Sequence, residues 1–195
     1  YVDIAKILGV KKMRHDATWG FKVTEPGRRN YMDAIRIIAP GIRSVTEYAE
    51  KQGIRTMCEN HGQFMQDAYR MEQLVLAVDH PNFGLLVDIG NFACADEECE
   101  KSVALVAPYA FHVHAKDFLF KPGTQPKPDE KWFATRVGNY LRGTVIGHGI
   151  VPVEQCLNII KKSGYDDCIS LEFEGLEEPR EAIRLGYEAL KRICK

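Results

Sequence analysis

The 195-residue chain lacks the features that mark several classes of protein. Its 26 Lys and Arg against 27 Asp and Glu leave a formal charge of −1, and the basic residues form no runs. A dedicated nucleic-acid or anionic-membrane surface is therefore not expected. No stretch approaches the roughly 18 consecutive apolar residues of a membrane-spanning helix. A glycine-rich phosphate loop is also missing, so the sequence gives no reason to expect a phosphorylated substrate.

The cysteines do not form the pattern of a disulfide framework. No two of them have the CxxC spacing, and they lie in segments predicted to be strands or helices. We expect them to be reduced and buried, as in an intracellular protein, which favours a cytoplasmic location. The sequence opens at Tyr1 without an initiator Met, so we also expect a missing N-terminal part and leave a signal peptide open. The six cysteines are Cys58, Cys94, Cys99, Cys156, Cys168 and Cys194.

The composition is that of an ordinary globular domain, with 45% hydrophobic and 27% charged residues. Short apolar runs alternate with amphipathic stretches, which is typical of repeated βα units around a parallel sheet. The predicted strands are 11–16, 54–60, 84–89, 110–115 and 168–173. The predicted helices are 29–51 with a break at Pro40-Gly41, 66–78, 96–107 with Asp96 as N-cap, 152–160 and 179–193.

Five βα units without an internal linker predict a single α/β domain over residues 1–195. Such units form either an open doubly wound sheet or part of a (β/α)8 TIM barrel. A complete barrel usually needs about 250 residues, so a barrel truncated at its N-terminus fits this length. Segment 118–146 is weakly periodic and contains several prolines and glycines. A segment of this length is typical of an active-site lid or binding loop, with a disordered insertion as the alternative.

Charged side chains follow the predicted strands at their carboxyl ends. Alternate residues of a strand share a face, and one face of each strand is apolar or small. Glu59, Asp88, His114 and Glu172 end four of the strands, where TIM barrels build their active sites. Three carboxylates and an imidazole facing one interior would repel and desolvate one another unless a cation compensates. The set predicts one divalent metal ion, with Mn²⁺, Mg²⁺ or Co²⁺ favoured by the oxygen ligands and Zn²⁺ tolerated.

Five motifs, taken in order across essentially the whole chain, resemble those of the sugar phosphate isomerase/epimerase superfamily, which has the xylose isomerase-like TIM barrel. The motifs are MCENHG at 57–62, LLVDIGN at 85–91, HVHAKD at 112–117, GHG at 147–149 followed by Pro152, and SLEFEG at 170–175. The resemblance implies that Glu59, Asp88, His114 and Glu172 bind one metal ion. It also implies that Glu59 and Glu172 face each other across the substrate as the acid/base pair.

The same resemblance implies a metal-dependent isomerase or epimerase acting on a sugar or sugar derivative. Such an enzyme removes a proton next to a carbonyl through an enediolate that the metal stabilises. The alternatives are a keto-inositol dehydratase, an endonuclease IV-like zinc nuclease and a non-catalytic sugar-binding barrel. The near-zero charge weighs against the nuclease. The expected partner is a small carbohydrate rather than a nucleic acid or membrane, and a homo-oligomer is left open.

Further polar residues near these motifs are candidates for contact with the substrate. Members of the superfamily often have His three residues after the metal-binding Asp, where this chain has Asn91. Alternative roles are a strand cap for His61, an ion pair with Asp117 for Lys116 and a surface turn for His148. His112 is expected to be a hydrogen-bonded interior histidine, and Glu174 a residue at the rim. The predicted substrate-binding residues are Arg14, His61, Asn91, Lys116 and His148.

Overall fold

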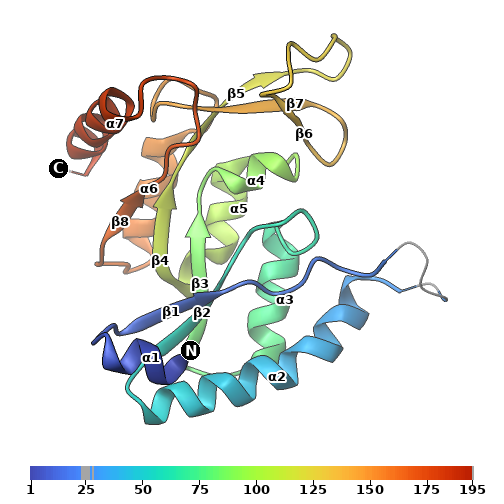
Figure 1. Cartoon of the computed structure of the whole chain (residues 1–195), viewed down its shortest axis with the longest axis vertical. Helices are drawn as coiled ribbons and strands as arrows, with labels where there is room; N and C mark the ends of the chain where they lie inside the picture. The colour runs from blue at the N-terminus through green and yellow to red at the C-terminus, as the bar shows by residue number, and fades with distance from the viewer. Residues whose placement is uncertain (23–26, 28, 195) are drawn as a thin grey trace.

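A computed structural model of the chain, which describes residues 1–22, 27 and 29–194, contains one curled sheet of five parallel strands (Figure 1). The order of the strands is β1-β2-β3-β4-β8, and each neighbouring pair is parallel. All five predicted strands are therefore confirmed, and they pair in sequence order. Their bounds are β1 Lys12–His15, β2 Arg55–Glu59, β3 Phe83–Asp88, β4 Ala110–Ala115 and β8 Ile169–Leu171.

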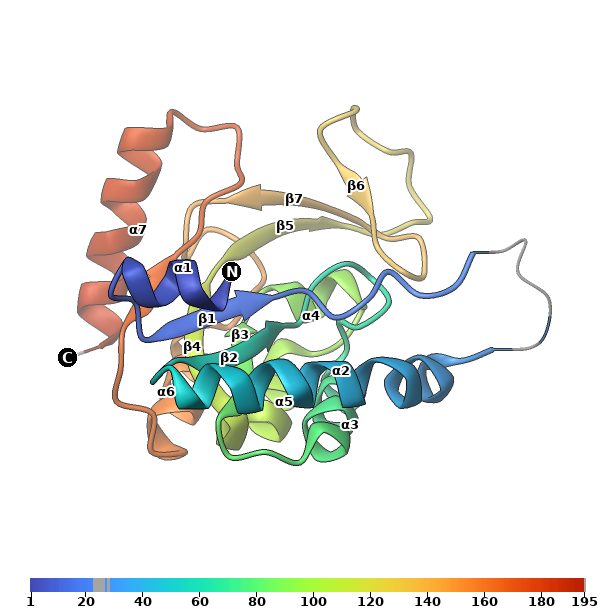
Figure 2. The same ribbon diagram turned by 60° about the horizontal axis from the view of Figure 1, so that its bottom comes forward.

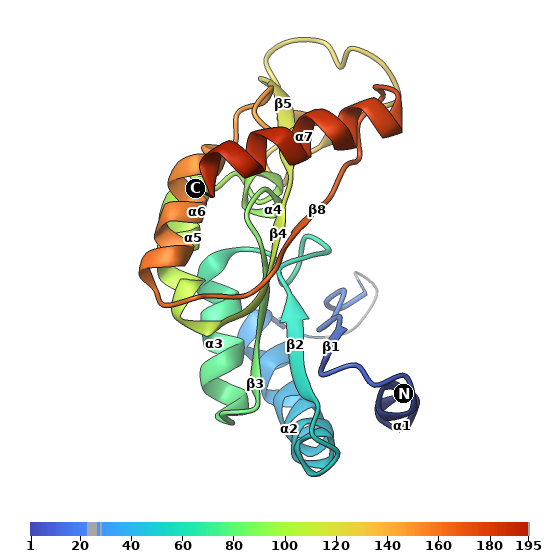
Figure 3. The ribbon, with the colours of Figure 1, turned by 90° about the vertical axis from the view of Figure 1, so that its left-hand side faces the viewer.

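Helices between the strands cover the outer face of this sheet. Figure 3 shows α3, α5 and α6 stacked along one side of β3 and β4, with β1 on the other side. This one-sided cover leaves the inner face to the polar side chains at the strand ends. The helices are α1 Val2–Ile7, α2 Tyr31–Lys51, α3 Ala68–Val78, α4 Asn91–Cys94, α5 Cys99–Val106, α6 Val153–Lys162 and α7 Pro179–Ile193, with a short 3₁₀ turn η1 at Ala107–Tyr109.

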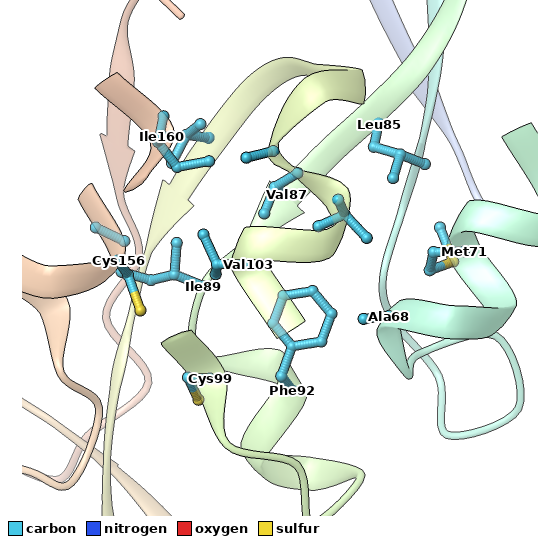
Figure 4. Close-up of a cluster of buried hydrophobic side chains, with 14 of the residues drawn as sticks. Ala68, Met71, Leu85, Val87, Ile89, Phe92, Cys99, Val103, Cys156 and Ile160 are labelled. Carbon is cyan, nitrogen blue, oxygen red and sulfur yellow. The ribbon is translucent and has the colours of Figure 1, made fainter. Parts of the chain in front are cut away.

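The apolar core lies between the sheet and these outer helices (Figure 4). Alternate residues along β3 and β4 are buried in this core. Examples are Val87 in β3, Ile89 directly after β3 and Val113 in β4, each at most 1% exposed. They pack with Met71 of α3 and Val103 of α5 in one contiguous cluster. The intervening strand residues face the other way, as the predicted alternation requires. Burial of one face thus sets which side chains point into the interior of the barrel.

Two details of the helix predictions were wrong. No break occurs at Pro40-Gly41, because α2 runs from Tyr31 to Lys51 with Pro40 inside it. Burial of Ile35 and Ala39 before the proline holds the first half of the helix to the main core. Burial of Ala49 after the proline holds the second half to a smaller cluster with Val2, Ala5 and Ile54. Asp96 is not a helix N-cap. It has a left-handed backbone with φ of 61°, and its carboxylate accepts hydrogen bonds from another segment, described next.

Segment 118–146 has more regular structure than its composition predicted. Together with Asp117 it forms a three-stranded antiparallel sheet in the order β5-β7-β6, which lies beyond the carboxyl ends of β3 and β4 (Figure 1). Figure 2 shows this sheet above β1 and β2, with α2 and α3 below them. Asp96 ties this sheet to the body by accepting hydrogen bonds from Thr135 Oγ1 at 2.7 Å, Val137 N at 2.8 Å and Asn139 Nδ2 at 2.9 Å. The strands are β5 Asp117–Lys121, β6 Phe133–Ala134 and β7 Tyr140–Thr144. None of the described helices is both long and apolar enough to cross a membrane.

The cysteines are free, as expected, but the prediction that all are buried was wrong for two of them. Cys168 and Cys194 are exposed, while the other four are buried. Burial raises the pKa of Cys58, Cys94 and Cys156 to about 12 and raises that of Cys99 as well.

We expect two thiols of the native protein to react rapidly with a disulfide reagent, because the buried thiols are neither accessible nor ionised. Absorbance titration with 5,5′-dithiobis(2-nitrobenzoate) checks this, and the unfolded chain should give six. Rapid reaction of three or more native thiols would contradict the packing of the core.

Candidate metal centre

Four side chains from successive strands of the sheet converge at its carboxyl edge. Glu59, Asp88, His114 and Glu172 each offer one ligand atom, and these four atoms all lie within 4.8 Å of one another. His114 Nδ1 is 3.1 Å from Glu172 Oε2, 3.9 Å from Glu59 Oε1 and 4.0 Å from Asp88 Oδ2. The register explains the convergence, since Asp88 pairs directly with His114 and Glu172 N donates to Ala115 O. The structure thus brings together the four residues that the sequence selected as metal ligands.

Asp88 is the most constrained member of the cluster. Its Oδ1 accepts hydrogen bonds from the backbone N–H of Gly90 and Asn91, both at 2.9 Å. Its Oδ2 is buried and has no hydrogen-bond partner among the described residues. A buried carboxylate oxygen without a partner is costly, and a bound cation would remove that cost. The donor set of three carboxylates and one imidazole therefore fits a divalent metal ion.

Asn60 was not recognised from the sequence as part of this centre. Its side-chain amide donates to Asp88 O at 2.9 Å, and its Oδ1 accepts from Asp88 N at 2.8 Å. These two bonds extend the pairing of β2 and β3 past Glu59, the last residue of β2, and fix the backbone of Asp88. Asn60 follows Glu59 directly, so strand alternation assigns it to the opposite face and gave no signal for a role at the cluster.

The protonation of the cluster depends on burial and on short contacts within it. Burial raises the pKa of Asp88 to about 7, although Lys116 opposes this increase. The hydrogen bond from His114 holds the pKa of Glu172 far below its usual value, against the effect of burial. Burial lowers the pKa of His114, but the bond to Glu172 and the charges of Asp88 and Glu59 outweigh it, and the net shift is upward. His114 and Asp88 are thus the groups that hold exchangeable protons near neutral pH.

Lys116 occupies the floor of the centre and is only 3% exposed. Its Nζ lies 3.6 Å from Asp88 Oδ2, 3.2 Å from Glu172 Oε1 and 3.2 Å from Glu174 Oε2. Burial lowers the pKa of Lys116, but these carboxylates outweigh it and raise the pKa above its usual value. The alternative ion pair with Asp117 was wrong, because the carboxylate of Asp117 is held by backbone amides. Glu174 lies at the rim, as predicted, with an exposed side chain.

Arg14 and Asn91, two predicted substrate-binding residues, both contact Glu59. Arg14 Nη2 is 2.6 Å from Glu59 Oε2 and also donates to Asp16 Oδ1 at 3.0 Å. Asn91 is buried, and its Nδ2 donates to Glu59 Oε1 at 3.4 Å while its Oδ1 accepts from Lys116 Nζ at 3.5 Å. Arg14 also lines an open groove of about 1210 Å³ along β1. These contacts hold Glu59 in one orientation and place Arg14 between the cluster and that groove.

The other histidines have different surroundings. His112 exchanges a hydrogen bond of 2.8 Å with Ser170 Oγ, and burial lowers its pKa, so the predicted interior role is confirmed. His61 is exposed, lies 3.9 Å from Asp16 Oδ1 and packs edge-on against Trp19. His148 is exposed on a turn, and its side chain forms no hydrogen bond to the residues that the structure describes. Neither His61 nor His148 belongs to the four-residue cluster.

We expect metal binding at this centre to strengthen as the pH rises through about 7, the pKa of Asp88. Below that pH a proton occupies Asp88, and His114 with its raised pKa is also protonated, so a metal ion must displace protons to bind. Each displaced proton weakens the apparent affinity by about tenfold per pH unit below its pKa. Calorimetric titration with Mn²⁺ in buffers of different ionisation enthalpy measures the protons released. Affinity that is constant between pH 5.5 and 8 would contradict this assignment.

The fold and the centre together define an α/β protein of the TIM-barrel class with a candidate divalent-metal site at the carboxyl edge of its sheet. The chain belongs to the xylose isomerase-like TIM barrel family, which it matches over residues 1–193. The resemblance inferred from the five motifs is thereby confirmed.

Similar proteins match this chain at low sequence identity. Inosose dehydratase of Lacticaseibacillus casei is 26% identical over 155 residues, which cover 79% of this chain and 51% of that protein. A xylose isomerase-like TIM barrel protein from Mycobacterium smegmatis in complex with magnesium superposes with a TM-score of 0.70 at 15% identity, over 98% of this chain and 64% of the other. The IOLI protein with a bound zinc atom gives 0.72 at 18% identity, over 98% and 66%. The chain thus spans about half the length of the curated relative it matches.

Proposed function

We propose that the protein is a divalent-metal-dependent enzyme that removes a proton next to a carbonyl group of a sugar or sugar derivative, with isomerisation or epimerisation as the outcome. The observation that carries the proposal is the convergence of Glu59, Asp88, His114 and Glu172 within 4.8 Å. Two of these residues are glutamates on β2 and at the end of β8, strands that are separated by β3 and β4. A substrate placed over the centre would therefore meet a carboxylate on each side.

The side chains of this chain would perform the proton transfer. A divalent ion held by the four residues would polarise the substrate carbonyl and stabilise the charge that develops. Glu172, which stays ionised because His114 lowers its pKa, would accept the proton from carbon at its carboxylate. Glu59, oriented by Arg14 and Asn91, would take up a proton from solvent and return it to carbon from the opposite side, while Glu172 would release its proton to solvent. Return to the neighbouring carbon gives isomerisation, and return to the other face of the same carbon gives epimerisation.

Residues around the two glutamates would bind the hydroxyl groups of the substrate. Lys116 and Asn91 present an ammonium and an amide beside Glu172 and Glu59, and Arg14 presents its guanidinium from the groove side. His61 and His148 are proposed to contact the substrate from the rim.

Segment 118–146 is proposed to cover the site as a lid within the single domain. In support, Phe118 lies with its ring 5.8 Å from Lys116 Nζ.

A second candidate is a dehydratase that acts on a keto-inositol. It is favoured by the match to inosose dehydratase of Lacticaseibacillus casei. The first chemical step is the same, because loss of water also begins with removal of a proton next to the carbonyl. The two candidates differ in the fate of the neighbouring hydroxyl group, which would leave after protonation in the dehydratase.

One experiment separates these candidates. The protein is incubated in D₂O with Mn²⁺ or Mg²⁺ and either a panel of 2-ketohexoses or 2-keto-myo-inositol, and ¹H NMR follows deuterium uptake at carbon and the products. Interconversion of sugars supports the isomerase or epimerase, and loss of water from the keto-inositol supports the dehydratase. Binding without deuterium uptake from any substrate would leave a non-catalytic sugar-binding protein. Several zinc ions per chain together with cleavage of abasic DNA would indicate the nuclease, which the near-neutral charge already disfavours.

A further inference from the structure

The turn that carries His148 is built around the carboxylate of Asp117. Asp117 is 1% exposed and begins β5, just after Lys116 and three residues after His114. Its Oδ2 accepts hydrogen bonds from Gly147 N and Gly149 N, both at 2.9 Å. Its Oδ1 accepts from Phe118 N at 2.8 Å and from Val151 N at 3.0 Å. Four backbone amides thus surround one buried carboxylate, which is a strong arrangement for an anionic acceptor.

Every amide of the turn between 147 and 151 has an acceptor. The carboxylate of Asp117 accepts hydrogen bonds from alternate amides of the turn, those of Gly147, Gly149 and Val151. The two amides between them donate to backbone carbonyls, His148 N to Val145 O at 3.0 Å and Ile150 N to Phe118 O at 2.8 Å. The turn is therefore fully hydrogen-bonded although it lies at the surface, where loops usually bond to water. Its backbone is held to the same chain segment that supplies His114 and Lys116.

The turn requires glycine at two positions, for a close approach at Gly149 and for a left-handed backbone at Gly147. A Cβ atom on Gly149 would lie 2.2 Å from Phe118 O and 2.3 Å from Asp117 Oδ1, which is far inside contact distance. Gly147 has φ of +88°, a left-handed conformation that favours glycine. Between them His148 is exposed while Val145, Ile146 and Val151 are at most 6% exposed. The backbone of the turn is thus hydrogen-bonded to the buried carboxylate of Asp117, and the turn presents one imidazole to solvent.

We propose that Asp117 is a positioning residue, which holds the 147–151 turn so that His148 contacts the substrate of the metal centre. The inference rests on the proposed function for the role of His148, whereas the anchoring of the turn stands on the hydrogen bonds alone. An exposed turn needs no buried carboxylate with four amide donors to remain folded, since water serves its amides equally well. A fixed position of the His148 imidazole relative to the substrate explains why a buried carboxylate stabilises this turn.

The test compares the full chain with Asp117→Asn, Gly149→Ala, His148→Ala and the double variant Asp117→Asn with His148→Ala. The asparagine replaces two acceptor sites by donors, and the alanine displaces the turn without changing Asp117. Gly41→Ala is the matched control, because a Cβ there meets nothing within 4 Å. Hydrogen exchange of the 145–151 peptide reports on the anchoring. Steady-state deuterium uptake with 2-keto-myo-inositol or a 2-ketohexose reports on KM and kcat.

We expect the 147–151 amides to exchange about 100-fold more slowly than free amides in the native protein, and to lose most of that protection in Asp117→Asn and Gly149→Ala. We expect each of these variants to raise KM about tenfold, as His148→Ala does, with little change in kcat, because only binding is lost. The double variant should be no worse than His148→Ala alone.

Protection that survives in Asp117→Asn would overturn the anchoring. Lost protection with an unchanged KM, or an unchanged KM in His148→Ala, would overturn the positioning role. Absence of deuterium uptake by the native protein as well would instead refute the proposed function, and with it the role of His148, while hydrogen exchange still decides the anchoring.

Discussion

Glu172→Gln is expected to reduce deuterium uptake from the substrate by about 10²–10⁴-fold, the usual contribution of a positioned general base. The amide has nearly the same shape, so the strand end and the contact with His114 are retained in geometry. It lacks the basic lone pair that accepts the proton, and it weakens the cluster as an anionic site. The measurement is the rate of deuterium uptake in D₂O at saturating Mn²⁺, with the thermal midpoint as a check of folding.

Glu174→Gln is the matched comparison for that variant. Glu174 lies two residues further along the chain and also contacts Lys116, at 3.2 Å, but it is outside the four-residue cluster. Its substitution should lower the rate by less than about tenfold, the size of a lost supporting interaction. If the two variants lose activity equally, or if Glu172→Gln keeps more than a tenth of the native rate, Glu172 is not the base.

Asp88→Asn is expected to have opposite effects on metal binding and on the stability of the metal-free protein. The affinity for Mn²⁺ should fall by about 100-fold or more, because loss of a direct ligand exceeds the loss seen for supporting residues. The metal-free variant should nevertheless be more stable than the native chain at pH 8, by about 1 kcal/mol, because the variant no longer buries an ionised carboxylate with one oxygen that accepts no hydrogen bond from the described residues.

The sign of the stability change follows from the raised pKa. A carboxyl group whose pKa rises from its ordinary value to about 7 on folding binds its proton more tightly in the folded state. The folded state therefore carries a penalty that is absent near pH 4 and grows as the pH rises toward 7. Asn at this position does not ionise and escapes the penalty, so the gain should appear at pH 8 and vanish near pH 4. Thermal unfolding at the two pH values, with EDTA present, measures it.

Asp166→Asn is the control for this comparison, since Asp166 is exposed and lies outside the cluster. It should change neither the affinity for Mn²⁺ nor the thermal midpoint. A metal-free Asp88→Asn protein that is less stable than the native chain at pH 8 would show that the carboxylate is satisfied without a metal ion.

The periodicity of apolar residues along the sequence was sufficient to predict most of the fold. The alternation of Val113 and Ala115 with His112 and His114 identified both faces of β4, and the structure places the first pair in the core. Helix α2 continues through Pro40, where the local sequence predicted a break, because burial of Ile35 in the core outweighs the cost of a proline within a helix. Periodicity also gave no signal for the small antiparallel sheet, whose docking depends on Asp96, a residue distant from it in sequence.

The convergence of the four side chains could be predicted because it depends on a repeated feature, a charged residue at the end of each strand. The supporting contacts depend on single pairs of residues and have no such period. Asn60 bonds to the backbone of Asp88, 28 residues away. Asp117 bonds to amides 30 to 34 residues further along. Such partners become visible only when the register of the strands and the path of the turns are known.

The central claim is that the four strand-end side chains share one divalent ion. The most direct test is titration of the metal-free chain with Mn²⁺, followed by electron paramagnetic resonance, for the native protein and for Asp88→Asn. We predict one tightly bound Mn²⁺ per native chain and weak binding in the variant. Absence of bound Mn²⁺ in the native chain, or equal binding by Asp88→Asn, would contradict the claim.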